Sequence, residues 1–212
     1  MRLINKDEIN NLESRKRAAL INSLIGVKAA NMIGTQDQQS VHNLSLISSL
    51  FHLGASPAMF GFVIRPDSVA RDTLNNLRMH PFLTINHVNS NIVKNAHQTS
   101  ARYDSEVSEF DKCELESEYL NDHPAPFVKE SKIKFSAKML REIKIPENGT
   151  HILICEIIDV HLAPSTLGDD FFIDITKTDT VGVSGLDQYL DLKALGRLSY
   201  AKPKMALKWL KL

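Results

Sequence analysis

The order of patterns between residues 29 and 81 constrains the fold more than any other feature. Three short strand-like runs, residues 29–37, 42–50 and 58–66, follow one another and are separated by polar turns and the segment GASP. The first clear helical pattern comes only after them, at residues 66–81. A parallel doubly wound sheet needs strands and helices to alternate. The sequence therefore predicts an antiparallel barrel with helical decoration.

The rest of the chain extends this interpretation. Turns separate further runs rich in β-branched and aromatic residues, which predict strands at residues 82–88, 150–162, 171–176 and 180–185. The helix at 66–81 is expected to begin after a cap at Asp67 or Ser68 and to end at Pro81. Other helices are expected at 90–103, capped by Ser90, at 108–114, at 186–198 and in part of the first 20 residues. No repeat or low-complexity linker occurs, so we expect a single, mainly β domain over residues 1–212.

Net charge argues against nucleic acid or a membrane as the main partner. The chain has 25 basic and 25 acidic residues, which give no net field to attract a polyanion. Residues 38–64 lack any charged side chain and are long enough to cross a bilayer. Their Gln, His, Asn, Ser and Pro residues make such a span too costly. The polar N-terminus lacks the apolar core of a signal peptide, so we expect a cytoplasmic protein.

Charge is nevertheless uneven along the chain. Residues 104–122 hold eight acidic residues and one base, whereas residues 193–212 hold six bases and no acid. Two solvated faces are the simplest interpretation, and complementary pairing between subunits is the alternative. Trp209 and the basic tail are expected to pack against the barrel or against a partner subunit.

Several common enzyme classes lack their motifs here. The sequence contains no GxGxxG, no GxxxxGK[ST], no HExxH and no GxSxG. The eight histidines are scattered, and Cys113 and Cys155 form neither a zinc spacing nor a disulfide framework. The sequence therefore predicts no metal site and singles out no catalytic side chain.

Residues 43–73 combine side chains that suit a phosphate group. Ser48 and Ser49 offer hydroxyl donors, and Arg65 and Arg71 offer guanidinium groups that match phosphate oxygens. Thr73, near the start of the expected helix, could add a hydroxyl beside backbone N–H groups. The alternative is that the serines are ordinary strand residues and that Arg65 is an ordinary charge at the end of a strand.

An ordered series of motifs resembles the flavin reductase-like, FMN-binding split-barrel family. The series runs from NLSLISSLFHLGASPAMFGFVIRP through DTLNNL and LTINHV, and continues with NAHQTSARY, SEF, PAPFVKES and VSGLDQY. It covers roughly residues 15–203. The chain departs from the family pattern in two places. Leu44, Ser45 and Leu46 stand where many members have Ala and Pro after the Asn, and Leu50 precedes Phe51 where Phe directly follows the serines.

The resemblance implies a homodimer of antiparallel Greek-key split barrels, with FMN bound near the subunit interface. By position, the flavin ring or ribityl chain would be bordered by Asn43, Leu44 and Ser45. The phosphate would be held by Ser48, Ser49, Arg65, Arg71 and Thr73. A third group would approach from the helix after LTINHV, namely His97, Thr99 and Ser100.

The function that follows from the resemblance is an NAD(P)H-dependent flavin reductase. Hydride would pass from a transiently bound nicotinamide to flavin N5, and reduced flavin could leave for a partner monooxygenase. One alternative is a non-catalytic flavin-binding or carrier protein on the same barrel. Another is a homologue that binds haem or a different planar ligand. Haem has no phosphate, so Ser48, Ser49 and Arg65 would have no phosphate to bind.

Overall fold

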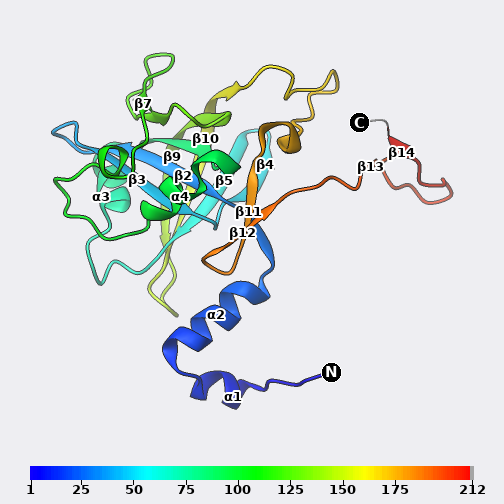
Figure 1. The fold of residues 1–212 in the computed structure, drawn as a ribbon, viewed down its shortest axis with the longest axis horizontal. Helices are drawn as coiled ribbons and strands as arrows, with labels where there is room; N and C mark the ends of the chain where they lie inside the picture. The colour runs from blue at the N-terminus through cyan, green and yellow to red at the C-terminus, as the bar shows by residue number, and fades with distance from the viewer. Residues whose placement is uncertain (211–212) are drawn as a thin grey trace.

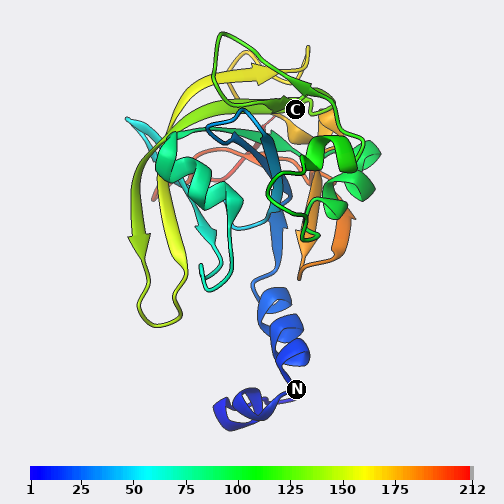
Figure 2. The ribbon, with the colours of Figure 1, turned by 90° about the vertical axis from the view of Figure 1, so that its left-hand side faces the viewer.

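An antiparallel sheet forms the centre of the protein, whose computed structural model describes residues 1–210. Seven strands follow one another across it in the order β3-β2-β6-β9-β10-β5-β4. Their bounds are β2 Asn31–Gln36, β3 His42–Ile47, β4 Phe51–Ala55, β5 Ala58–Ile64, β6 Phe82–His87, β9 Ile133–Lys144 and β10 His151–Leu162. The sheet curls strongly, as Figure 2 shows. The predicted mainly β, antiparallel fold is therefore confirmed.

The remaining strands form three small sheets. One joins β1 (Val27–Ala29), β11 (Val181–Ser184) and β12 (Gln188–Asp191), and the two others are β7 (Ser117–Glu118) with β8 (Phe127–Val128) and β13 (Arg197–Leu198) with β14 (Trp209–Leu210). The helices are short: α1 Lys6–Asn11, α2 Ser14–Leu24, α3 Asp72–Met79, α4 Val93–Gln98 and α5 Glu109–Lys112, with 3-10 turns η1 Ser90–Ile92 and η2 Ile175–Thr178. Helices α1 and α2 bury no residue and extend away from the barrel (Figure 1).

Strand β2 separates two apolar cores. Successive side chains of a strand point to opposite faces, so Met32 packs with Leu44, Val88 and Phe110 in one core. Its neighbour Ile33 packs with Phe62, Leu74, Leu83 and Leu153 in the other core. Helix α3 closes the second core with Leu74 and Leu77, both of which are buried. Burial on both faces explains why β2 lacks the apolar–polar alternation of a surface strand.

The end of edge strand β3 approaches β5 on the other side of the sheet. Ser49 lies in the link between β3 and β4, and its hydroxyl both donates to the Val63 carbonyl oxygen and accepts from the Val63 N–H, each at 3.0 Å. Strands β3 and β5 stand first and sixth in the strand order, so these two bonds join opposite parts of the curled sheet.

Two predicted elements are wrong. Residues 186–198 form no helix, because β12 pairs with β11 and β13 pairs with β14. Residues 171–176 form no strand. They contain one isolated bridge, between Leu167 and Ile173, and then enter η2. Within the large sheet, two strands were missed, β4 and β9. Strand β9 pairs with β6 on one side and β10 on the other, and its second half is mostly exposed. The short strands β7, β8, β12, β13 and β14 were not predicted as strands either.

Helix caps also differ from the sequence expectation. Helix α3 begins at Asp72 after Arg71, because Asp67 and Ser68 belong to the loop that precedes it. Asn89 rather than Ser90 caps the next helical segment, with its side chain accepting from the Asn91 N–H at 3.1 Å.

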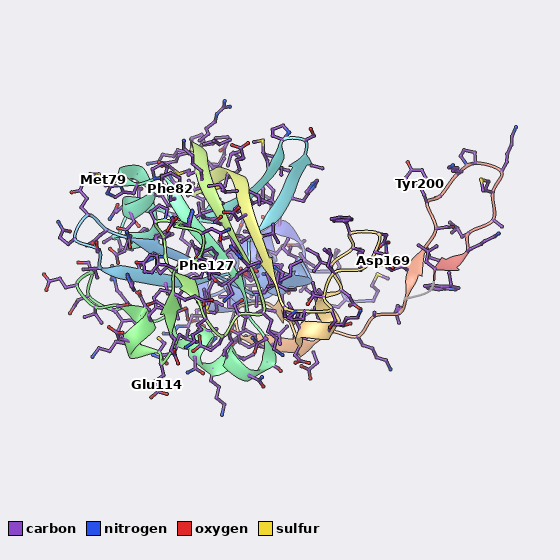
Figure 3. The ribbon with its side chains drawn as sticks, turned by 90° about the horizontal axis from the view of Figure 1, so that it is seen from above. Met79, Phe82, Glu114, Phe127, Asp169 and Tyr200 are labelled. Carbon is purple, nitrogen blue, oxygen red and sulfur yellow. The ribbon has the colours of Figure 1, made fainter. Side chains whose placement is uncertain are left out.

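The basic tail does not pack against the barrel. Figure 3 shows Tyr200 well away from the body of the protein, and Tyr200 is 86% exposed. The tail is attached to the body through Arg197, which pairs with Asp170 at 2.7 Å and lies 3.8 Å from the centre of the Phe172 ring. Trp209 contacts Gly196 within the same hairpin.

Candidate functional site

A cavity of about 850 Å³ opens where β3 and β5 diverge. Its walls come from these two strands, from the loop between β5 and α3, from the first turn of α3, from α4 and the segment after it, and from the β11–β12 turn. Ten of the eleven residues singled out from the sequence line it: Asn43, Ser45, Ser48, Ser49, Arg65, Arg71, Thr73, His97, Thr99 and Ser100. The fold thus brings together residues that are up to 57 positions apart, from Asn43 to Ser100.

Thr73 is the centre of a hydrogen-bond network in the cavity wall. The Asn43 side-chain amide donates to the hydroxyls of Thr73 and Thr35, both at 3.0 Å. The Ser45 and Thr73 hydroxyls lie 2.9 Å apart. Asn76 of α3 also donates to Thr35, at 3.2 Å. These bonds fix β3 against the start of α3 and hold the polar side chains in one orientation.

Positive charge gathers at the end of β5. Arg65 follows the strand directly, and Arg71 precedes α3. The Arg71 Nε donates to the Pro66 carbonyl oxygen at 3.1 Å, whereas its terminal nitrogens make no hydrogen bond within residues 1–210. Because the guanidinium is fixed through Nε, the remaining donors are ready to bind an anion. Ser48 lines the same cavity, and its hydroxyl makes no hydrogen bond within residues 1–210, whereas the Ser49 hydroxyl is bonded to Val63.

Leu44 is the one predicted site residue that does not line the cavity. Its side chain is fully buried in the core with Met32. Its backbone N–H donates to Glu109 Oε2 at 2.9 Å. Glu109 itself lines the cavity, and burial raises the pKa of its carboxyl, with a further small contribution from Asp72.

Another part of the cavity lining comes from the end of α4 and the residues after it. His97 Nδ1 lies 2.9 Å from the Tyr189 hydroxyl of β12, which holds the imidazole edge-on to the tyrosine ring. The Thr99 and Ser100 hydroxyls donate to the carbonyl oxygens of Ala96 and His97, at 2.8 and 2.6 Å. These hydroxyl protons are therefore committed to the helix end, and the oxygens remain as acceptors.

Sequence reasoning missed several lining residues, including Glu109, Tyr103, Arg102 and the β11–β12 turn at Leu186 and Asp187. Glu109 lies in the SEF motif, and Leu186 and Asp187 lie in VSGLDQY, so the signal was present in the motif series. Residues 1–210 contain no group of three His, Cys, Asp or Glu side chains arranged to hold a metal ion. Within the same residues, every helix is too short or too polar to span a lipid bilayer.

Comparison with known proteins identifies the class to which this fold and cavity belong. The family model described as flavin reductase like domain matches residues 28–173, and the chain belongs to that family. A protein from Shewanella frigidimarina NCIMB 400, described as a candidate flavin reductase with split barrel domain, is 49% identical. It superposes with a TM-score of 0.92 over 95% of this chain and 100% of its own. The split barrel predicted from the motif series is therefore confirmed.

Two more distant structures share the fold. Nitrilotriacetate monooxygenase component B from Bacillus cereus has a TM-score of 0.82 at 18% identity, over 93% of this chain and 98% of its own. The NADH:FAD oxidoreductase of Streptomyces globisporus C-1027 has a TM-score of 0.65 at 13% identity, over 86% of this chain and 97% of its own.

Proposed function

We propose that the chain is an FMN-binding oxidoreductase that takes hydride from NADH or NADPH. The observation that carries this proposal is the cavity itself. A chain of the flavin reductase family lines one space of about 850 Å³ with the guanidinium groups of Arg65 and Arg71 and with a set of hydroxyls. That volume falls within the range of roughly 300–1,000 Å³ typical of cofactor pockets.

The lining fits a flavin mononucleotide in its chemistry. Arg65, Arg71 and Ser48 would hold the phosphate, and the β-strand residues Ser45 and Asn43 would border the polar chain and the ring. Apolar side chains suited to a flat ring line the same cavity, namely Leu46, Ile47, Val63, Val183 and Leu186. Bound flavin supplies the redox chemistry as hydride acceptor and donor, and the protein supplies binding and orientation.

The residues of this chain would act by placement and by exclusion of water. Thr73, held by Asn43 and Ser45, would keep the start of α3 at a fixed distance from β3. His97, oriented by Tyr189, would border the open side at which a nicotinamide must stack face to face on the flavin. The names of two structural relatives, an NADH:FAD oxidoreductase and a monooxygenase component, support a nicotinamide donor and a partner oxygenase as acceptor of the reduced flavin.

An absorbance spectrum tests this function directly. The purified protein is mixed with FMN, desalted, and then treated anaerobically with NADH and, separately, with NADPH. Retained bands near about 370 and 450 nm that bleach with either nucleotide are the expected result. Retained bands that neither nucleotide bleaches would favour the carrier function instead. If FMN is lost on desalting and NADH is not oxidised when free FMN is supplied, the proposal is wrong.

We further propose that the protein works as a homodimer in which the tail of one copy binds the other. Residues 193–210 carry five bases and no acid, and their large apolar side chains are exposed: Leu195, Tyr200, Met205, Leu207 and Trp209. The acidic residues of the segment 104–114 offer a complementary charge, and most of them lie on the surface. An isolated arm with exposed aromatic rings needs a partner surface, and two-fold dimers are the commonest assemblies that supply one.

Removal of the tail is expected to convert the dimer to a monomer. Light scattering after gel filtration should give about 48 kDa for the full chain, which is twice the 23.8 kDa of one copy. A chain that ends at Leu198 should give the monomer mass. A matched control that changes only Lys193 to alanine should remain dimeric. A monomeric full chain, or a truncated chain that still dimerises, would contradict this proposal.

A further inference from the structure

Two of the arginines that line the cavity, Arg65 and Arg71, are the first and last residues of one loop, residues 65–71. Ion pairs attach the middle of this loop to the large sheet. Asp67 in its middle lies outside the set of residues that line the cavity. One carboxylate oxygen, Oδ1, lies 3.3 Å from His151 Nε2 and 3.7 Å from Lys144 Nζ. The other, Oδ2, lies 3.5 Å from Arg78 Nη2. A single loop carboxylate thus faces three nitrogen-bearing side chains from α3, β9 and β10.

Glu142 of β9 contacts two of the same side chains, Arg78 and His151. Arg78 donates to both of its oxygens, with Nε at 2.9 Å from Oε2 and Nη2 at 2.6 Å from Oε1. His151 Nδ1 lies 2.7 Å from the same Oε1. His151 is only 1% exposed, so the imidazole is enclosed between the Asp67 and Glu142 carboxylates. A bidentate guanidinium and a buried imidazole have a fixed geometry, unlike a pair of free surface charges.

The surrounding side chains lower the pKa of both carboxyls in the cluster. The contact with His151, followed by the charge of Lys144, lowers the pKa of Asp67. The hydrogen bond from Arg78, followed by that with His151, lowers the pKa of Glu142. Both acids therefore stay charged at neutral pH and hold their partners.

Residues 65–67 connect the cluster around Asp67 to the cavity. Asp67 follows Pro66, and the Pro66 carbonyl oxygen accepts the hydrogen bond from Arg71 Nε at 3.1 Å. Arg65 is the residue on the other side of Pro66. The position of Pro66 therefore bears directly on where the Arg71 guanidinium lies, and Asp67 is the next residue in the chain.

We propose that Asp67 is a positioning residue, which acts with Arg78, Glu142 and His151 to hold the loop that carries Arg65 and Arg71 in place for the flavin phosphate. The inference rests on the proposed function. Fixing the loop, and with it Arg71, in advance removes part of the ordering cost when the phosphate binds.

Substitution of Asp67 by asparagine separates this role from simple electrostatics. Loss of a negative charge near an anion site would, by Coulomb's law alone, strengthen phosphate binding. Loss of positioning would weaken it. We expect fluorescence titration to show FMN bound about five- to tenfold more weakly, the scale of ordering one or two long side chains. Riboflavin, which lacks the phosphate, should bind within about twofold of its wild-type affinity.

Two further variants complete the test. Arg78→Gln removes the opposite side of the cluster without touching the cavity, and it should cause the same selective loss of FMN affinity. Glu116→Gln removes an exposed carboxylate that pairs with Lys129 outside the cavity lining, and it should leave both affinities unchanged. Unchanged or tighter FMN binding in Asp67→Asn, or an equal loss of FMN and riboflavin, would overturn the positioning role. If the wild-type chain binds neither flavin, the proposed function itself fails and the positioning role fails with it.

Discussion

Replacing Arg71 with alanine is expected to weaken FMN binding by about 1.5–3 kcal/mol, or roughly 10- to 150-fold. Arg71 is half-buried at the start of α3, and its Nε is bound to the Pro66 carbonyl oxygen, so its terminal nitrogens are pre-oriented toward the cavity. A hydrogen bond between two charged groups in such a setting is stronger than one at the open surface. Fluorescence titration with FMN measures the change directly.

The matching measurements identify the phosphate as the cause. Riboflavin affinity should be almost the same in Arg71→Ala and in the wild type, because riboflavin has no phosphate. Arg65→Ala should give a smaller loss of FMN affinity, since Arg65 is exposed and its guanidinium makes no hydrogen bond or ion pair in the part of the chain that the structure describes. Arg141→Ala, an exposed arginine on β9 outside the cavity lining, serves as the control and should change nothing. An FMN affinity that survives the loss of Arg71 would place the phosphate elsewhere in the cavity.

The strands were predictable where a local pattern determines them. The runs that became β2, β3, β5, β6, β10 and β11 were all located from the sequence. The run DQYLDLKAL has the apolar spacing of a helix. Its residues Gln188–Asp191 nevertheless form strand β12, which pairs antiparallel with β11. Long-range pairing decides such a segment, and a single sequence does not display it. Residues 133–139 are different, because they alternate apolar and polar side chains in the pattern of a strand, and our sequence analysis did not assign them.

At the candidate site, the sequence predicted which residues come together but not how their side chains bond. Residue types and motif order were enough to assemble ten residues that share one cavity. Their individual hydrogen bonds were not foreseeable. Ser48 and Ser49 are adjacent and chemically identical, but the Ser49 hydroxyl is consumed by Val63. The cluster around Asp67 was equally hidden, because Glu142 and His151 lie 75 and 84 positions away in the chain.

Replacing Gly34 with alanine is expected to destabilise the fold by about 3 kcal/mol or more. Gly34 lies in β2 between β3 and β6, behind the network that joins Thr35, Asn43 and Thr73. A Cβ atom at this position would overlap the Pro126 carbonyl oxygen and the Thr84 hydroxyl. That hydroxyl donates to the same carbonyl at 2.6 Å, so the added methyl must break a buried hydrogen bond or displace β2. Overpacking costs roughly 1–3 kcal/mol, and an unpaired buried polar group adds about 1–3 more.

Urea denaturation of two glycine variants tests the crowding at Gly34. Gly54→Ala makes the same chemical change in β4, where the new Cβ would lie 3.5 Å from the Pro57 carbonyl oxygen, an ordinary contact. Its stability should stay within about 1 kcal/mol of the wild type, because reduced freedom of the unfolded chain offsets small losses. Gly34→Ala should unfold at a clearly lower urea concentration and should lose FMN affinity with it, since β2 supports the Asn43–Thr73 wall. Equal midpoints for the two variants would mean that β2 moves freely at this point and that the wall of the cavity does not depend on it.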